Sequence, residues 1–168
     1  LCARKYTFIQ LIPVNTILLG SFSKTVAPGF RLGWMNGPKQ IMPQFEKVKQ
    51  CTDLHTNTFV QYVCYEYLKA GMLEKHIQII RDDYRAKRDV MLKTIEKTFP
   101  SGIHWTKPEG GLFLWVELPS GMSAKELWST ALERKVAYLY GEPFYPNGGG
   151  ENTLRLNFSN ATHDNIDH

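Results

Sequence analysis

The chain has 168 residues, of which 43% are hydrophobic, which is enough for a domain with a substantial buried core. It carries 20 Lys and Arg residues and 16 Asp and Glu residues, giving a net charge of +4 without any dense basic block. This distribution argues against a nucleic-acid-binding patch or a basic membrane-binding surface. No apolar run reaches the roughly 18 residues that a membrane-spanning helix needs. We therefore expect neither nucleic acid nor a membrane as a partner.

The cysteines and histidines exclude further classes of site. Cys2, Cys51 and Cys64 are odd in number and form no Cys-x-x-Cys pair, which argues against a disulfide framework and a zinc knuckle. The five histidines form no His-x-x-x-His pair and no Cys/His cluster, so no metal site is predicted. A reducing compartment, the cytoplasm, is the expected location.

The first half of the chain predicts one short strand and two helices. Residues 15–20 form an apolar run typical of a strand, and open α/β sheets bind ligands where such strands end. Apolar residues at helical spacing predict helices over residues 38–49 and 56–69, the second ending at Gly71. Asp53 and His55 are interpreted as structural, with Asp53 capping the start of the second helix.

A long amphipathic helix is predicted over residues 73–99. Its apolar positions keep steps of three, four or seven residues, while charged residues fill the other face. At about 1.5 Å per residue it would span about 40 Å, a length suited to connecting two domains.

After Pro100 the composition changes to aromatic and β-favouring residues, which predicts a small mixed subdomain. Ser123 and Glu126 form a capping box that would open a helix through about Lys135. The glycine run at 148–150 precedes a strand and lacks a Lys-Ser/Thr ending, so it is interpreted as a flexible turn. Strands are expected at residues 103–105, 111–118, 136–139 and 153–158.

The chemistry-bearing segment is Ser21-Phe22-Ser23-Lys24, directly after the first predicted strand. A lysine amine condenses with an aldehyde to form an imine, and doing so with pyridoxal phosphate also requires a site for its phosphate dianion. Ser21, Ser23 and Arg31 offer hydroxyl and guanidinium donors suited to phosphate. A turn at Pro28-Gly29 would let Lys24 and Arg31 converge on one site.

Residues 20–34 closely resemble the lysine segment of class I/II aminotransferases of fold type I. The similarity is greatest to the branch with 2-aminoadipate and kynurenine aminotransferases and with aminotransferase-like domains of certain bacterial regulators. Three later segments, residues 52–56, 108–115 and 152–159, resemble the same family in the same order. Together the four segments span nearly the whole chain, and they are far more specific than a Ser-x-Ser-Lys tetrapeptide alone.

The resemblance implies an α/β fold and a chain that is the C-terminal part of such an enzyme. Residues 1–72 would be the remnant of the large cofactor-binding domain, including the end of its sheet. Residues 73–99 would be the long interdomain helix, and residues 100–168 a truncated small α+β subdomain. The ligands of the cofactor's pyridine ring would lie upstream of Leu1, so the fragment alone is expected to be inactive.

The resemblance also assigns roles to individual residues. Pyridoxal 5'-phosphate would be the cofactor, with Lys24 as the Schiff-base lysine that also moves the substrate proton. Ser21, Ser23 and Arg31 match its phosphate ligands, and Arg155 matches the arginine that binds the substrate α-carboxylate.

The implied function is a cytosolic, homodimeric aminotransferase. It would transfer an amino group from an L-amino acid of the 2-aminoadipate, aromatic or branched-chain type to a 2-oxo acid such as 2-oxoglutarate. Two alternatives stay open: another fold-type I enzyme, such as a lyase or decarboxylase, and an effector-sensing domain of a transcription regulator with an N-terminal winged helix.

Overall fold

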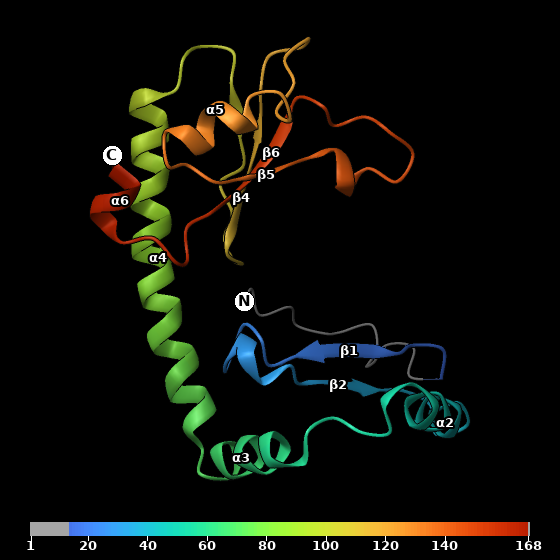
Figure 1. The fold of residues 1–168 in the computed structure, drawn as a ribbon. Helices are drawn as coiled ribbons and strands as arrows, with labels where there is room; N and C mark the ends of the chain where they lie inside the picture. Colours follow the sequence, from blue (N-terminus) through green and yellow to red (C-terminus); the bar gives the residue numbers. More distant parts are fainter. Residues whose placement is uncertain (1–13, 168) are drawn as a thin grey trace. The chain divides into compact units, whose positions relative to one another are not determined.

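The structure is a computed structural model that describes residues 14–167. Its fold is α/β, with helices and antiparallel strands (Figure 1). The chain divides into two compact units between Ile80 and Arg81, inside one long helix. The domain limits expected from the sequence, at residues 72 and 99, stay a prediction. Within residues 14–167, no helix combines the length and apolar character needed to cross a membrane.

The first unit contains a two-stranded antiparallel ribbon, β1 (Leu18–Ser21) with β2 (Gly33–Asn36). The strand expected at residues 15–20 is confirmed, although it begins at Leu18. The sequence did not predict β2, because its four residues are all exposed and only their pairing with β1 makes them a strand. Gly20 lies opposite Trp34, whose indole fills the space that a Cβ at position 20 would need.

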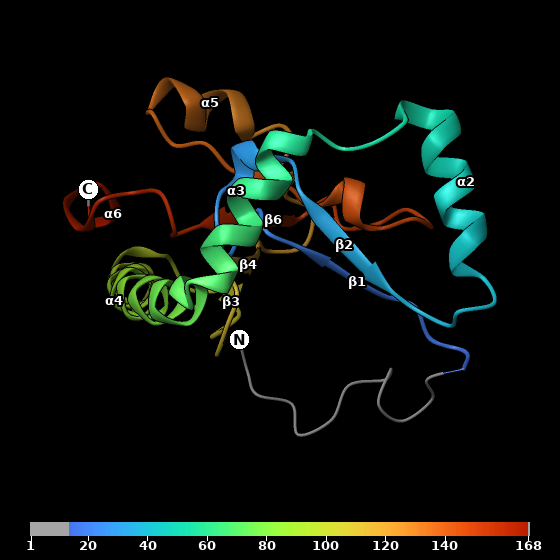
Figure 2. The ribbon, with the colours of Figure 1, turned by 90° about the horizontal axis from the view of Figure 1, so that it is seen from below.

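Two helices follow in this unit, α2 (Met42–Asp53) and α3 (Thr58–Lys69). Helix α2 begins four residues later than predicted, after a turn at Pro38. The loop that joins β1 to β2 lies at the end of the ribbon away from α2 (Figures 1 and 2).

The prediction that Asp53 caps the second helix is wrong. Asp53 ends α2 and forms an ion pair with Lys49, one helical turn earlier, at 2.7 Å. The cap of α3 is Asn57, whose side-chain oxygen accepts a hydrogen bond from Val60 N at 3.2 Å. The Asp53 carboxylate is bound to Lys49 of its own helix, whereas Asn57 directly precedes α3 and caps it.

The predicted long helix is confirmed as α4 (Met72–Thr98). The apolar stripe of its second half packs into the core of the second unit, where Ile95 is buried against Leu114 and Phe158. Tyr84 and Met91 contact the same cluster, so the periodicity identified the correct face.

The second unit is built on a four-stranded antiparallel sheet with the order β3–β4–β6–β5. Alternate residues of its central strands point to opposite faces. Leu114, Val116 and Leu154 are buried on the core face, which stabilises the unit by roughly 1.5–3 kcal/mol for each side chain. Phe113 and Trp115 therefore lie on the other face. The strands are β3 (His104–Trp105), β4 (Phe113–Glu117), β5 (Leu139–Tyr140) and β6 (Thr153–Asn157).

The predicted capping box forms only in part. Ser123 Oγ accepts a hydrogen bond from Glu126 N at 3.2 Å, but residues 124–127 form turns and the helix α5 spans only Trp128–Glu133. The Tyr138 hydroxyl donates to Ala124 O at 2.6 Å and so ties this segment to the chain before β5. Burial raises the pKa of Tyr138. The remaining short elements are η1 (Pro28–Phe30), η2 (Glu142–Phe144) and α6 (His163–Asp167).

A close approach at Gly141 gives a test of this packing. A Cβ at position 141 would overlap Thr153 Oγ1, which donates to Gly150 O at 2.7 Å in the interior. We expect Gly141→Ala to lower the free energy of unfolding by about 1–3 kcal/mol, because backbone or Thr153 must move. Gly29→Ala is the matched control, since its Cβ would meet open space. Equal stability of the two variants in chemical denaturation would contradict this packing.

Candidate active site

The loop from β1 to β2, residues 22–32, is held by its own backbone hydrogen bonds. The N–H groups of Thr25, Val26 and Ala27 all donate to Phe22 O, at 3.3, 2.8 and 3.1 Å. Phe22 N donates to Leu32 O at 3.0 Å and closes the base of the loop. The loop is therefore an ordered turn that can hold side chains in fixed directions.

Lys24 lies in this turn, three residues after the end of β1, as the sequence predicted. Its side chain is exposed, and within residues 14–167 it has no hydrogen-bonding or ion-pair partner. An amine without a carboxylate partner is available for covalent chemistry.

The three residues predicted to bind phosphate, Ser21, Ser23 and Arg31, lie on the same loop or at its edge. Ser21 Oγ accepts a hydrogen bond from Ser23 N at 3.1 Å, and its own hydroxyl proton can still donate to a ligand. Arg31 Nη1 donates to Pro28 O at 3.1 Å, which leaves further guanidinium N–H groups for an anion. These three residues and Lys24 thus supply two cations and two hydroxyls and, in the described part of the chain, no carboxylate pairs with either cation. This donor set fits a phosphate dianion.

Arg31 also has an unusual backbone conformation. Its φ of 50° and ψ of 36° lie in the left-handed region, which costs a non-glycine residue roughly 1–2 kcal/mol. Strained backbone conformations of this kind cluster at functional sites, where the surrounding structure maintains them.

Arg155 lies in the other unit, on β6, opposite Trp115 of β4 and Leu139 of β5. Its guanidinium carbon is 4.0 Å from the centre of the Phe113 ring and 4.7 Å from that of Phe144. These contacts are cation–π interactions, and they fix the guanidinium on the face of the sheet away from the core.

Arg155 differs from the other half-buried cations. Among the described residues only Lys87, Arg88 and Arg155 are half-buried Lys or Arg residues. Lys87 and Arg88 have carboxylate partners, at 2.9 and 2.7 Å, whereas Arg155 has none within residues 14–167. A partly desolvated guanidinium that keeps its hydrogen-bond donors free is suited to bind a carboxylate ligand.

Sequence reasoning missed the aromatic support of Arg155. Alternation along β4 could have placed Phe113 and Trp115 on one face. The register that brings Arg155 beside them depends on a pairing between segments some 40 residues apart, which no local pattern reveals. Phe144, from η2, belongs to the same group and packs edge-on against Trp115 with 5.4 Å between ring centres.

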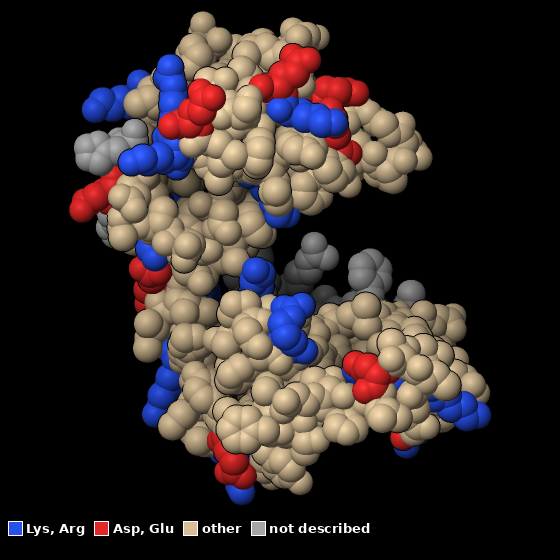
Figure 3. All heavy atoms as spheres, viewed as in Figure 1, with Lys and Arg blue, Asp and Glu red and all other residues tan. Residues whose placement is uncertain are grey.

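The cysteines and the metal-binding side chains give no comparable candidate site among the described residues. Cys64 is buried in α3, and burial raises the pKa of its thiol, which lowers the thiolate fraction at neutral pH. Cys51 is free and exposed on α2, and Cys2 lies outside the described residues. In the part of the chain that the structure describes, no three His, Cys, Asp or Glu side chains gather as a metal-binding group. On the face drawn in Figure 3, basic and acidic side chains are interspersed.

Comparison with known proteins decides the family. Residues 8–168 match the family described as aminotransferase class I and II. The chain belongs to this family. The cofactor of these aminotransferases is pyridoxal phosphate, in agreement with the donors on the Lys24 loop. Among curated relatives, aromatic-amino-acid aminotransferase 1 of Thermococcus litoralis is 44% identical over 152 residues. That alignment covers 90% of this chain and 36% of the relative.

Solved structures agree on the fold. Kynurenine aminotransferase of Pyrococcus horikoshii is 49% identical with a TM-score of 0.85, covering 90% of this chain and 37% of that one. The α-aminoadipate aminotransferase LysN of Thermus thermophilus, complexed with N-(5'-phosphopyridoxyl)-L-leucine, is 40% identical with a TM-score of 0.86, covering 90% and 39%. The chain therefore has the α/β fold of part of a fold-type I aminotransferase and spans less than two-fifths of these relatives.

One group of relatives is described as transcriptional regulators and not as aminotransferases. The HTH-type transcriptional regulator NorG of Staphylococcus aureus is 33% identical over 154 residues, which cover 92% of this chain and 34% of NorG. The identity to NorG is thus lower than that to the three aminotransferases named above.

The conformation of Arg31 leads to a prediction that separates backbone strain from charge. In cofactor-free full-length protein, Arg31→Gly should be more stable than Arg31→Ala by about 1 kcal/mol, because only glycine adopts this φ without cost. Both variants should bind pyridoxal phosphate more weakly, since both lose the guanidinium. Thermal unfolding and cofactor titration measure the two effects. An alanine variant as stable as the glycine variant would show that position 31 is unstrained.

Proposed function

We propose that the protein is a pyridoxal-phosphate-dependent aminotransferase that moves an amino group from an L-amino acid to a 2-oxo acid. The observation that carries the proposal is that Lys24 and Arg31 lie on one ordered loop and that, within residues 14–167, neither has a carboxylate partner, in a chain of this family. The bound cofactor would supply an electron-withdrawing ring that stabilises negative charge at the substrate α-carbon.

Each residue of the candidate site then has one task. Lys24 would hold the cofactor through its amine, and its Nζ, once released by the substrate, would carry the proton from the substrate α-carbon to the cofactor. Ser21, Ser23 and Arg31 bind the phosphate. Arg155 binds the α-carboxylate through charge-assisted hydrogen bonds worth roughly 1.5–3 kcal/mol each.

The donor is proposed to be of the 2-aminoadipate, aromatic or branched-chain type, with 2-oxoglutarate as acceptor. Support comes from relatives named for aromatic amino acids, kynurenine and α-aminoadipate.

We also propose a cytoplasmic homodimer. Large apolar side chains such as Phe45, Phe59 and Tyr62 are exposed on α2 and α3, and such surface needs a cover. The free thiols Cys51 and Cys64 are compatible with a reducing compartment.

The similarity to NorG supports one alternative, an aminotransferase-like domain that senses an effector in a transcription regulator. The sequence before Leu1 distinguishes the two, because a helix-turn-helix segment there would favour regulation. Another fold-type I reaction, elimination or decarboxylation, shares the lysine chemistry and is distinguished by analysis of the products.

Lys24 gives the direct test of the proposal. Borohydride reduction of the full-length protein with its cofactor should fix a pyridoxyl group on the peptide that contains Lys24. Lys24→Ala should lower the turnover rate by about a thousandfold or more, because proton transfer loses its base. Added methylamine should restore part of that rate. Lys39→Ala, at an exposed turn lysine of the same unit, is the control and should keep full activity. A label found elsewhere, or full turnover by Lys24→Ala, would refute the assignment.

Arg155 gives a second test. Arg155→Lys keeps the charge but loses the planar fork, so the KM for the amino-acid donor should rise by roughly 10–100-fold. Arg134→Lys, on an exposed position after α5, should leave the KM unchanged. An unaltered donor KM in Arg155→Lys would remove Arg155 from the substrate site.

A further inference from the structure

We propose that Arg88 is a positioning residue for Arg155. It acts by holding the backbone before β4 and, through that strand, the Phe113 ring on which the Arg155 guanidinium stacks. The inference rests on the proposed function, in which Arg155 binds the substrate carboxylate.

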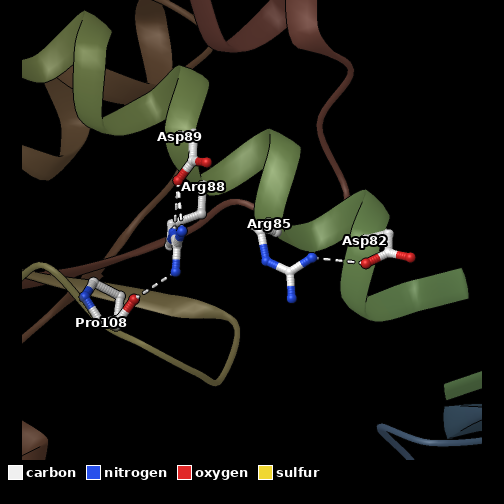
Figure 4. Close-up of polar contacts among 5 residues, drawn as sticks. All are labelled: Asp82, Arg85, Arg88, Asp89 and Pro108. Carbon is white, nitrogen blue, oxygen red and sulfur yellow. Dashed lines mark hydrogen bonds and ion pairs between the residues drawn. The ribbon is translucent and has the colours of Figure 1, made fainter. Parts of the chain in front are cut away.

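Arg88 bridges α4 and the loop before β4 (Figure 4). Its Nε and Nη2 both donate to Asp89 Oδ1, at 2.9 and 2.7 Å. Its Nη1 donates to Pro108 O at 3.1 Å. Asp89 thus occupies one edge of the planar guanidinium and leaves the other nitrogen to hold the Pro108 carbonyl.

Arg85, one helical turn away, provides a contrast in the same figure. Its Nη1 donates to Asp82 Oδ1 at 2.7 Å, a contact within the helix itself (Figure 4). The Arg85 side chain is 52% exposed, whereas that of Arg88 is 23% exposed. Burial and the bond to a distant backbone group therefore distinguish Arg88 from an ordinary surface arginine.

The loop that Arg88 holds leads directly into β4, whose first residue, Phe113, contacts the Arg155 guanidinium. Thr106 N donates to Trp115 O at 2.9 Å, and Trp115 N donates to Thr106 Oγ1 at 3.0 Å, which fixes the base of the loop. Pro108 lies within the loop, and five residues later Phe113 begins β4 under the Arg155 guanidinium, at 4.0 Å. A shift of Pro108 is thereby transmitted to the ring that orients Arg155.

The neighbouring residue strengthens the case. Lys87 Nζ donates to Ser159 O at 3.2 Å, just beyond the end of β6. Consecutive cations of α4 therefore fasten the backbone before β4 and the backbone after β6. These are the two strands that carry Phe113 and Arg155.

The test compares Arg88→Met with Arg85→Met in the full-length holoenzyme. Arg88→Met should raise the KM for the amino-acid donor by about fivefold, a typical effect for coupling through packed contacts, with little change in kcat. Arg85→Met should change neither constant. Arg88→Lys keeps a charge beside Asp89 but loses the planar fork of donors, so it should show a smaller rise in KM. This variant provides the test if Arg88→Met folds poorly.

A double variant separates positioning from simple stabilisation. In the Arg155→Lys background, Arg88→Met should have no further effect on the donor KM, because the residue through which it acts is already altered. A fivefold rise that persists in this background, or equal falls in kcat for every substrate, would overturn the inference while leaving Arg155 in place. An Arg155→Lys variant with normal donor KM would instead refute the proposed role of Arg155 in binding the substrate carboxylate, on which this inference rests.

Discussion

The pairing of β4 with β6 is the interaction on which the second unit depends. One register places Leu114, Val116 and Leu154 in the core and puts Phe113 and Arg155 on the opposite face. Because side chains alternate with a period of two, a slip of β6 by one residue would turn Arg155 to the core face and Leu154 to the opposite face. The burial that stabilises the sheet therefore also specifies where the guanidinium lies. Stability and site geometry are set by the same hydrogen-bond ladder.

The Lys24 loop follows a different principle, because little of it is buried. Its order comes from three N–H groups that share the Phe22 carbonyl and from the closing bond between Phe22 and Leu32. Hydrogen bonds of this local kind cost little chain entropy to close. They allow a short turn to present Lys24 and Arg31 without a hydrophobic core beneath each side chain. The left-handed backbone at Arg31 is the cost of that arrangement.

The sequence predicted most of what depends on local periodicity. Helix α4 was found to within one residue at each end, and Ile95 and Met91 lie on the expected face, because a long amphipathic stripe contains many consistent positions. Short elements were less predictable. Strand β2 has no buried residue to mark it, and α5 loses its first turn although Ser123 provides the expected cap. Lys24, Ser21, Ser23 and Arg31 could be selected because they lie close together in the chain. Phe144 and Arg88 could not, because their roles depend on contacts between segments far apart in sequence.

The positive charge of Arg155 is partly buried in the sheet unit, and the same charge is the one proposed to bind the substrate carboxylate. Partial burial of a cation carries a desolvation cost that a carboxylate normally offsets, as Asp83 does for Lys87 and Asp89 does for Arg88. At Arg155 the rings of Phe113 and Phe144 offset part of that cost, roughly 0.5–2 kcal/mol, without using the hydrogen-bond donors. Within residues 14–167 no carboxylate offsets the remainder, which agrees with the proposed binding of a substrate carboxylate at Arg155. The rings support the guanidinium without competing for the hydrogen-bond donors that such a ligand would use.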